Sequence, residues 1–316
     1  MNPKIRNRKF LSRWLFVFTA LFLVILFTGC DDTPSEFGDY EAEPSLTAFI
    51  ATGEPVEEIY LDRIGAFSAP YSRENNGISG AEIILYPVAA HAETESIDPT
   101  NPDSLRFVED ENINGRYVPV DNDYRPEGRV RYRIEARKAS EDVYVWAETT
   151  VPDTFSIETF YQHDLVNPID LDGDTLRRTD DEFLVTWSES ATADGHVLNI
   201  LALSPKDELI PLDPDWDPND PDDEIDDEDK ERFTYTIAPD YQSSITMAWF
   251  YFEWAGWTRL DVYASSDDYY QYVFSILTAF GETDNPQSNV NGGRGIFGAV
   301  AKNSFMVYME RALPEE

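Results

Sequence analysis

The sequence contains a single cysteine, Cys30, and only three histidines in 316 residues. One thiol excludes an internal disulfide, and His91, His163 and His196 lack the spacing of a zinc ligand set. Each histidine is therefore expected at the surface or at a strand end. The chain also lacks a Gly-x-Ser-x-Gly motif and a phosphate-binding P-loop. With none of these signatures present, the sequence predicts a protein that is not an enzyme.

Basic residues are scarce as well. Lys and Arg together number 24 against 61 Asp and Glu, which gives a formal net charge of −37. Such a charge repels the phosphates of nucleic acids and anionic lipid headgroups, so nucleic acid is not an expected partner. An acid-rich, lysine-poor surface is typical of proteins that work in concentrated salt. An acidic secreted protein from an ordinary habitat is the alternative interpretation.

The longest apolar run, residues 14–27, follows a basic and acid-free N-terminus. A run of this length is short for a helix that spans a bilayer, which needs ~20 residues. A basic head, a short apolar stretch and small residues after it are typical of a secretory signal peptide, which is expected over residues 1–29. The small residues Thr28 and Gly29 directly precede Cys30.

Cys30 is therefore the expected lipidation site, because "LFTGCDD" (26–32) has the pattern of a bacterial lipoprotein box. The sulfur would carry a diacylglyceryl group and the new amine a fatty acyl chain, and two or more chains anchor a protein stably to a membrane. An uncleaved N-terminal anchor with an incidental cysteine is the alternative. Residues 30–44 are acidic and contain Pro, Gly and Ser, so we expect an extended tether there.

Residues 45–152 are predicted to form an immunoglobulin-like β-sandwich. Short β-branched and aromatic runs alternate with clusters of turn residues and show no helical period. In the run 130–137, apolar and charged residues alternate as in a strand with one buried face. The expected strands are 45–51, 57–64, 81–88, 104–109, 115–120, 130–137 and 143–151.

Residues 153–316 are predicted to form a second β-sandwich with an acidic insertion at 205–232 and one amphipathic helix at 265–281. The helix is expected to bury a stripe made by Tyr269, Val273, Ile276, Leu277 and Phe280. The expected strands are 182–189, 196–204, 232–238, 244–254, 258–265 and roughly 298–308. The predicted fold class is thus mostly β, with two tandem β-sandwich (immunoglobulin-like) domains.

Two acidic stretches are candidate calcium sites. In 170–181, Asp170, Asp172 and Asp174 have the spacing of oxygen ligands in a calcium loop, but the sixth position is not glycine and the twelfth is not glutamate. The second stretch, 213–231, is rich in carboxylates and prolines and must be an exposed insertion. Solvated loops suited to high salt are the alternative for both stretches. The candidate ligands in the second stretch are Asp213, Asp215 and Asp217.

The aromatic run 247–257 is a candidate binding surface. Read as a strand over 244–254, it places odd-numbered residues on one face and even-numbered residues on the other. One face would fill the core, and the other, if no helix covers it, would form an aromatic patch for a partner or a ligand, carbohydrate included. Core packing with helix cover is the alternative. The candidate patch residues are Trp249, Tyr251, Trp254 and Trp257.

The glycine-rich stretch 291–298 precedes a predicted strand rather than a helix, so it lacks the geometry of a phosphate site. Its glycines are expected to permit tight turns and close backbone packing where the last strand begins.

Several segments together resemble a known family. They are "SLTAFIA" (45–51), "ISGAEIILY" (78–86), "NGRYVP" (114–119), "YRIEAR" (132–137) leading towards "AETTVPDTFSIET" (147–159), "YYQYVFSI" (269–276) and "NPQSNVNGGRGIFGAV" (285–300). They resemble the Bacteroidota-type envelope lipoproteins of the domain-of-unknown-function family numbered 4249. The resemblance extends over nearly all of the chain after the leader.

The resemblance implies a lipoprotein commonly encoded near outer-membrane TonB-dependent receptors and without an established activity. In that lineage, acids directly after the lipidated cysteine are similar to the signal for the outer-membrane surface, which is the location we expect. In enteric bacteria, an aspartate there signals retention in the inner membrane instead.

Three functional hypotheses follow. The first is a non-enzymatic, lipid-anchored surface lipoprotein that assists a TonB-dependent receptor in nutrient uptake. The second is a structural or adhesive envelope module, stiffened by calcium. The third is an enzyme of an unfamiliar type.

Overall fold

The computed structural model describes residues 42–65, 72–88, 103–162, 172–177, 183–213, 233–238, 243–278 and 286–311. Between 213 and 233 it describes residues 215–217, 219, 220, 225 and 230. The predicted signal peptide and several residues singled out by the sequence lie outside the described residues. These residues are Cys30, His91, His163, Asp170 and Phe280.

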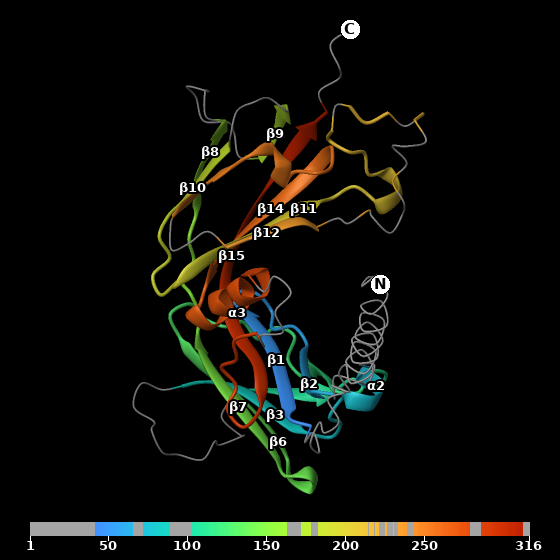
Figure 1. Cartoon of the computed structure of the whole chain (residues 1–316). Helices are drawn as coiled ribbons and strands as arrows, with labels where there is room; N and C mark the ends of the chain where they lie inside the picture. Colours follow the sequence, from blue (N-terminus) through green and yellow to red (C-terminus); the bar gives the residue numbers. More distant parts are fainter. Residues whose placement is uncertain are drawn as a thin grey trace, which may run out of the picture. The chain divides into compact units, whose positions relative to one another are not determined.

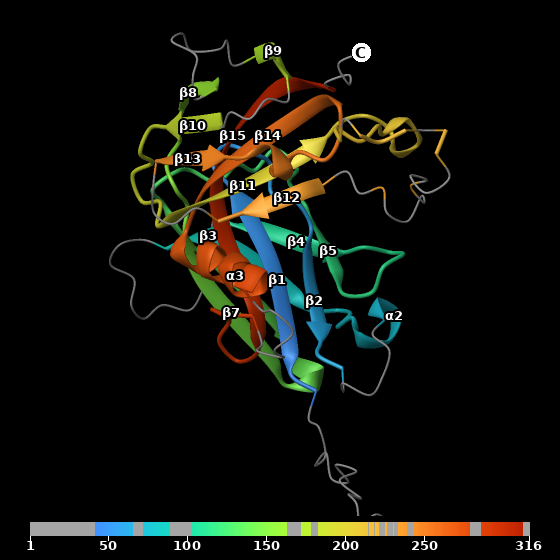
Figure 2. The same cartoon turned by 45° about the horizontal axis from the view of Figure 1, so that its top comes forward.

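The predicted mostly-β fold is confirmed. The described strands form one sheet of twelve strands and a second sheet of three, accompanied by two α-helices in this part of the chain (Figure 1, Figure 2). Among the described residues, no helix has both the length and the apolar character needed to cross a membrane.

The first seven predicted strands are all present, each within two residues of its expected ends. The strand β6 has the predicted alternation, because Tyr132, Ile134 and Ala136 are buried whereas Arg131 and Arg137 are exposed. A short helix, α2 (Arg73–Asn76), occupies part of a predicted turn. The strands are β1 (Pro44–Ala51), β2 (Ile59–Arg63), β3 (Glu82–Pro87), β4 (Leu105–Glu109), β5 (Arg116–Pro119), β6 (Arg131–Lys138) and β7 (Val143–Thr150).

The later part of the chain differs more from expectation. The sequence missed β8 and β9, and the last strand begins before the predicted residue 298. The elements are β8 (Ile157–Gln162), β9 (Asp172–Arg177), β10 (Phe183–Trp187), β11 (Gly195–Ala202), β12 (Phe233–Ile237), β13 (Ser244–Met247), β14 (Gly256–Ser265), helix α3 (Asp267–Thr278) and β15 (Arg294–Glu310).

The strand β15 links the two ends of the described chain. Its first half pairs in parallel with β1, from Ser45 opposite Arg294 to Ala51 opposite Val300. Its second half pairs in antiparallel fashion with β14 and in parallel with β9 (Figure 1). The large sheet therefore has the order β12-β11-β14-β15-β1-β2-β5-β4-β3-β6-β7, with β9 beside β15.

The edge strand β7 returns to the segment that precedes β15. The Trp146 N–H donates to the Asn291 carbonyl oxygen at 3.1 Å, and the Asn291 N–H donates back to the Trp146 carbonyl oxygen at 2.8 Å. This bridge makes the strands from β15 through β1 to β7 curl around one core. It also pairs part of an edge that would otherwise be open to another chain.

Two large hydrophobic clusters fill most of the described fold. The first gathers side chains from residues 46–151 together with Val290, Phe297 and Ala299 from the end of the chain. The second lies between the sheet β13-β10-β8 and the strands β11, β14 and β15. Because residues 42–316 form one compact unit in which β15 serves both clusters, the domain boundary at residues 152–153 stays a prediction.

Helix α3 is present, but the predicted buried stripe is wrong for its second half. The buried residue of the helix is Tyr270, and Tyr269 packs edge-on against Phe49 of β1 at a ring distance of 5.6 Å. Ile276 and Leu277 remain 49% and 38% exposed. The spacing of apolar residues in the sequence predicts a helix, but it does not show how much of that helix packs against the sheet.

The glycines of residues 291–298 were expected to permit close packing of the backbone, and the structure confirms this at two of them. Gly295 has a φ of 114° and lies opposite Leu46 in the β1–β15 pair. A Cβ atom at Gly295 would overlap the carbonyl oxygen of Leu46, and one at Gly292 would overlap that of Tyr144. The glycines therefore allow β15 to approach β1 and β7.

We expect Gly295→Ala to lower the free energy of unfolding by about 3 kcal/mol. Alanine would be strained at this φ, and its Cβ atom would overlap the carbonyl oxygen of Leu46. The matched control is Gly53→Ala, which has a φ of 71° but nothing within 4 Å of the added Cβ. The free energy of unfolding of this control should fall by about 1 kcal/mol, because alanine there adds backbone strain without a steric overlap. Urea unfolding of both variants measures the difference, and equal losses would contradict the close approach of β1 and β15.

Candidate functional site

The aromatic run does not form the predicted strand. β13 ends at Met247, and Trp249–Tyr251 form a single turn of 3-10 helix. The predicted alternation over 244–254 is therefore wrong. The turn directs both Trp249 and Phe252 into the second hydrophobic cluster. Period-2 alternation cannot be recognised where nearly every residue is apolar, so the sequence did not distinguish the turn from a strand.

One wall of a pocket is made by this turn and is anchored in the core. Trp249 is 8% exposed, and its ring centre lies 4.6 Å from that of Phe183 on β10. Phe252 lies 5.6 Å from the same Phe183 ring. Edge-on contacts of this kind add to the burial of the rings, so this wall is held in place.

The opposite wall belongs to a third, smaller apolar cluster. Here Trp254 packs with Ala202, Leu209 and Ile225. The backbone hydrogen bonds from Leu212 N–H to the Glu253 carbonyl oxygen, at 2.7 Å, and from Ala255 N–H to the Ile210 carbonyl oxygen, at 2.8 Å, join the two segments. The pocket is therefore built from residues 209–213 and 249–255, which are tied together by main-chain contacts.

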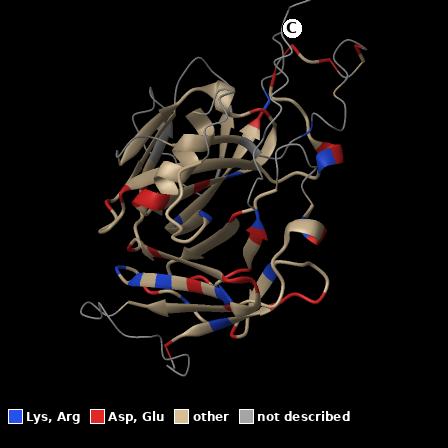
Figure 3. Ribbon diagram, turned by 60° about the horizontal axis from the view of Figure 1, so that its bottom comes forward, with Lys and Arg blue, Asp and Glu red and all other residues tan. Residues whose placement is uncertain are grey.

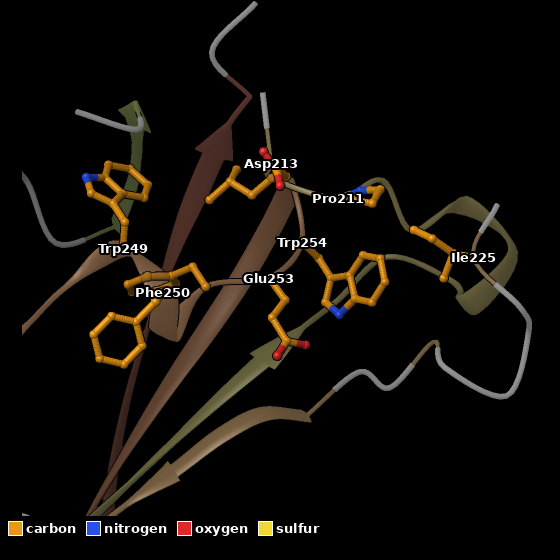
Figure 4. A pocket seen from close by; sticks show the side chains of 9 residues that line it. Pro211, Asp213, Ile225, Trp249, Phe250, Glu253 and Trp254 are labelled. Carbon is orange, nitrogen blue, oxygen red and sulfur yellow. The ribbon is translucent and has the colours of Figure 1, made fainter. Parts of the chain in front are cut away.

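The pocket has a volume of about 400 Å³ (Figure 4). Its lining is mainly apolar and aromatic, and Phe250 on its border is 63% exposed. The ionisable side chains that line it are the carboxylates of Asp213 and Glu253, and none of its described lining residues is basic. The lining residues are Pro211, Leu212, Asp213, Ile225, Trp249, Phe250, Phe252, Glu253 and Trp254.

The structure brings together two of the four candidate aromatic residues. Trp249 and Trp254 both line the pocket. Tyr251 is half-buried beside Phe250, whereas Trp257 lies on β14, 43% exposed and edge-on to Tyr308 of β15. Sequence reasoning missed the contribution of residues 211–213 and Ile225, because nothing in the acidic insertion indicates which aromatic segment it contacts.

The first candidate calcium stretch is not one loop. Asp172 and Asp174 lie on β9, which pairs with β15, so the predicted loop over 170–181 is wrong for this part of the stretch. The backbone of a strand is extended, unlike the wrapped backbone of a calcium loop.

In the second stretch, the carboxylates form local turns. Asp213 accepts the Asp215 N–H at 3.1 Å, and Asp217 accepts the backbone and side-chain N–H groups of Asn219, both at 2.9 Å. These bonds from Asn219 lower the pKa of Asp217. In the described part of the chain, no group of three or more Asp, Glu, His or Cys residues is arranged to hold a metal ion. Calcium binding stays a prediction.

Two buried carboxylates lie outside the pocket and are balanced by cations. On β14, Asp261 is 1% exposed and forms ion pairs with Arg259 at 2.9 Å and Lys302 at 3.2 Å. On β6, Glu135 is 3% exposed and forms ion pairs with Arg133 at 2.8 Å and Arg137 at 2.7 Å. Figure 3 marks the acidic and basic residues along the ribbon. Buried charges require such partners, so both groups have a structural explanation.

His196 lies at the start of β11 and is buried rather than at the surface. It is 7% exposed and packs between Trp187 and Phe155, with ring centres 5.0 Å and 6.1 Å away. Neither ring nitrogen has a hydrogen-bond partner among the described residues. Burial lowers the pKa of His196 from its ordinary value of 6.5 to about 4.

We expect His196 to make stability depend on pH. Because the pKa is lower in the folded state, the unfolded chain binds the proton first, so this contribution is full above pH 6.5 and is lost as the pH falls towards 4. Between pH 7 and pH 4.5 this group should cost about 2 kcal/mol of unfolding free energy. Urea unfolding of the wild type, His196→Phe and His196→Gln tests this, since both variants should lose less stability than the wild type. The same loss in all three proteins would show that His196 does not contribute.

Comparison with known proteins identifies a family. The family model described as Domain of unknown function (DUF4249) matches residues 38–305. No curated protein matches the chain.

Two solved structures are similar to the chain over most of its length. Salmonella alpha-2-macroglobulin reacted with methylamine is 11% identical, with a TM-score of 0.20, over 85% of this chain and 15% of that chain. A Ca2+-stabilised adhesin with which an Antarctic bacterium binds ice is 11% identical, with a TM-score of 0.19, over 85% of this chain and 50% of that chain. The chain spans half or less of these proteins, and likenesses this weak carry no argument. The family match extends over most of the sequence, and the protein belongs to the family of unknown function DUF4249.

Proposed function

We propose that the protein is a non-enzymatic, lipid-anchored lipoprotein of the outer-membrane surface, which binds a small nutrient for a TonB-dependent receptor. The observation that carries the proposal is the position of Cys30. The one thiol of the chain follows a basic head, an apolar stretch and two small residues, and two aspartates come directly after it. Chance placement of a sole cysteine at that point is a poor alternative.

The pocket supports the binding part of the proposal. Ligand sites are concave and mostly apolar, with a few polar groups, and commonly have volumes of roughly 300–1,000 Å³. The pocket beside Trp249 and Trp254 has this character, with a volume of about 400 Å³ and carboxylates from Asp213 and Glu253. Its walls are fixed by core contacts and by main-chain hydrogen bonds, so little ordering would oppose binding.

The anchor is tested by protease shaving of intact cells combined with mass analysis of the N-terminal peptide. The wild type should be cut from the cell surface and should leave a peptide that begins with an acylated Cys30. Cys30→Ser should abolish lipidation, so that no acylated N-terminal peptide is found. An intact leader, or a mature chain with a bare thiol, would refute the proposed anchor.

A matched variant separates anchoring from surface display. Replacement of Asp31 and Asp32 by alanine leaves Cys30 in place, so lipidation should persist. If the acids direct the protein to the surface, this variant should resist external protease while it remains in the membrane fraction. Unchanged accessibility would refute their role in surface display.

The receptor is tested by affinity purification of the tagged lipoprotein from mildly solubilised membranes. A TonB-dependent receptor should co-purify with the wild type, and deletion of the lipoprotein should slow growth on the nutrient that the receptor imports. A pull-down without a receptor, together with altered cell adhesion and unchanged growth, would contradict the proposal. That result would favour a structural or adhesive module.

A further inference from the structure

We infer that the pocket between residues 209–213 and 249–255 binds a small organic cation with a flat apolar body, such as a protonated aromatic amine. This inference rests on the proposed function only in treating the pocket as the capture site. It names the ligand chemistry that the described residues of the pocket would recognise.

The walls select a flat apolar body. Trp249 and Phe252 form one side and Trp254 the other, and each of these rings is buried by contacts behind it. Phe250 adds a ring that is 63% exposed (Figure 4). This ring is held against Tyr251 at a ring distance of 4.2 Å. Aromatic surfaces on several sides favour planar groups, because such groups stack on or pack edge-on against them.

The charges select a cation. Asp213 and Glu253 are the ionisable residues in the lining, and both are acidic. A carboxylate has about four lone-pair sites, so it accepts a ligand N–H in addition to the contacts it already makes. The electrostatic field of the whole protein also attracts cations, since the formal net charge is −37.

One cation, Arg311, lies next to the pocket but does not line it. Arg311 donates from Nε to the Asp213 carbonyl oxygen at 3.1 Å and also donates to the Trp216 carbonyl oxygen. Its guanidinium lies 5.2 Å from the centre of the Trp216 ring, and Arg311 is not among the lining residues. Arg311 thus donates hydrogen bonds to the main chain of the insertion, and its charge also acts on Asp217.

The aromatic and acidic features reinforce each other. The face of an aromatic ring attracts a cation, and the attraction grows when the cation leaves water. An ammonium group near Glu253 would therefore interact with a carboxylate and with the rings of Phe250 and Trp254. An anion of the same shape would meet the two carboxylates and be repelled.

The test compares three probes that share one ring: 2-phenylethylamine, 2-phenylethanol and 3-phenylpropionate. Dissociation constants are measured on the purified protein by NMR titration of the indole N–H signals. We expect the amine to bind about tenfold more tightly than the anion, with the alcohol between them. The difference should shrink at high salt, which screens exposed charges.

Two variants and two controls locate the binding. Glu253→Gln should reduce the preference for the amine several-fold, and Phe250→Ala should weaken binding of all three probes. Glu82→Gln removes one charge from an exposed position on β3, and Phe274→Ala removes a ring that is 44% exposed on α3. Both controls should bind as the wild type does, and circular dichroism checks that all four variants are folded.

Equal affinity for the three probes, or an amine preference that Glu253→Gln leaves unchanged, would overturn the inference about charge. Failure of all three probes to bind would overturn the pocket as a site for this ligand class. Neither result bears on lipidation or on receptor co-purification, which the cell experiments test separately.

Discussion

The fold depends on the double pairing of β15. One continuous strand joins β1, from the start of the described chain, to β14 and β9, from its later part. The parallel contact with β1 requires main chains to approach closely at Gly295, where any side chain would meet the carbonyl oxygen of Leu46. The single cysteine of the chain cannot form an internal disulfide between its two parts. The pairing of β1 with β15 and the apolar clusters therefore hold these parts together.

Sequence patterns predicted the strands that alternate and failed where alternation is absent. β6 was predictable because Tyr132 and Ile134 point inward between charged residues, whereas β9 begins in an acidic run that suggested a calcium loop. The aromatic turn at Trp249–Tyr251 cannot be distinguished from a strand by its sequence, because every position there is apolar. The pairing of β1 with β15 has no local signal, since it joins residues from opposite ends of the chain.

The same limit applies to the pocket. The aromatic run indicated Trp249 and Trp254, but the segment 209–213 that completes the pocket lies in an insertion whose composition indicated calcium ligands or solvated acids. The main-chain contacts between Leu212 and Glu253 and between Ala255 and Ile210 convert this insertion into one wall of the site.

Amide hydrogen exchange along β15 tests the central claim most directly, because it reports which segments open together. If β15 unites the two clusters, the amides of 296–300 and of 303–307 should exchange only through global unfolding, with the same free energy of opening. Markedly faster exchange in 296–300 than in 303–307, with the second cluster still protected, would show that the two parts open independently and would contradict the account.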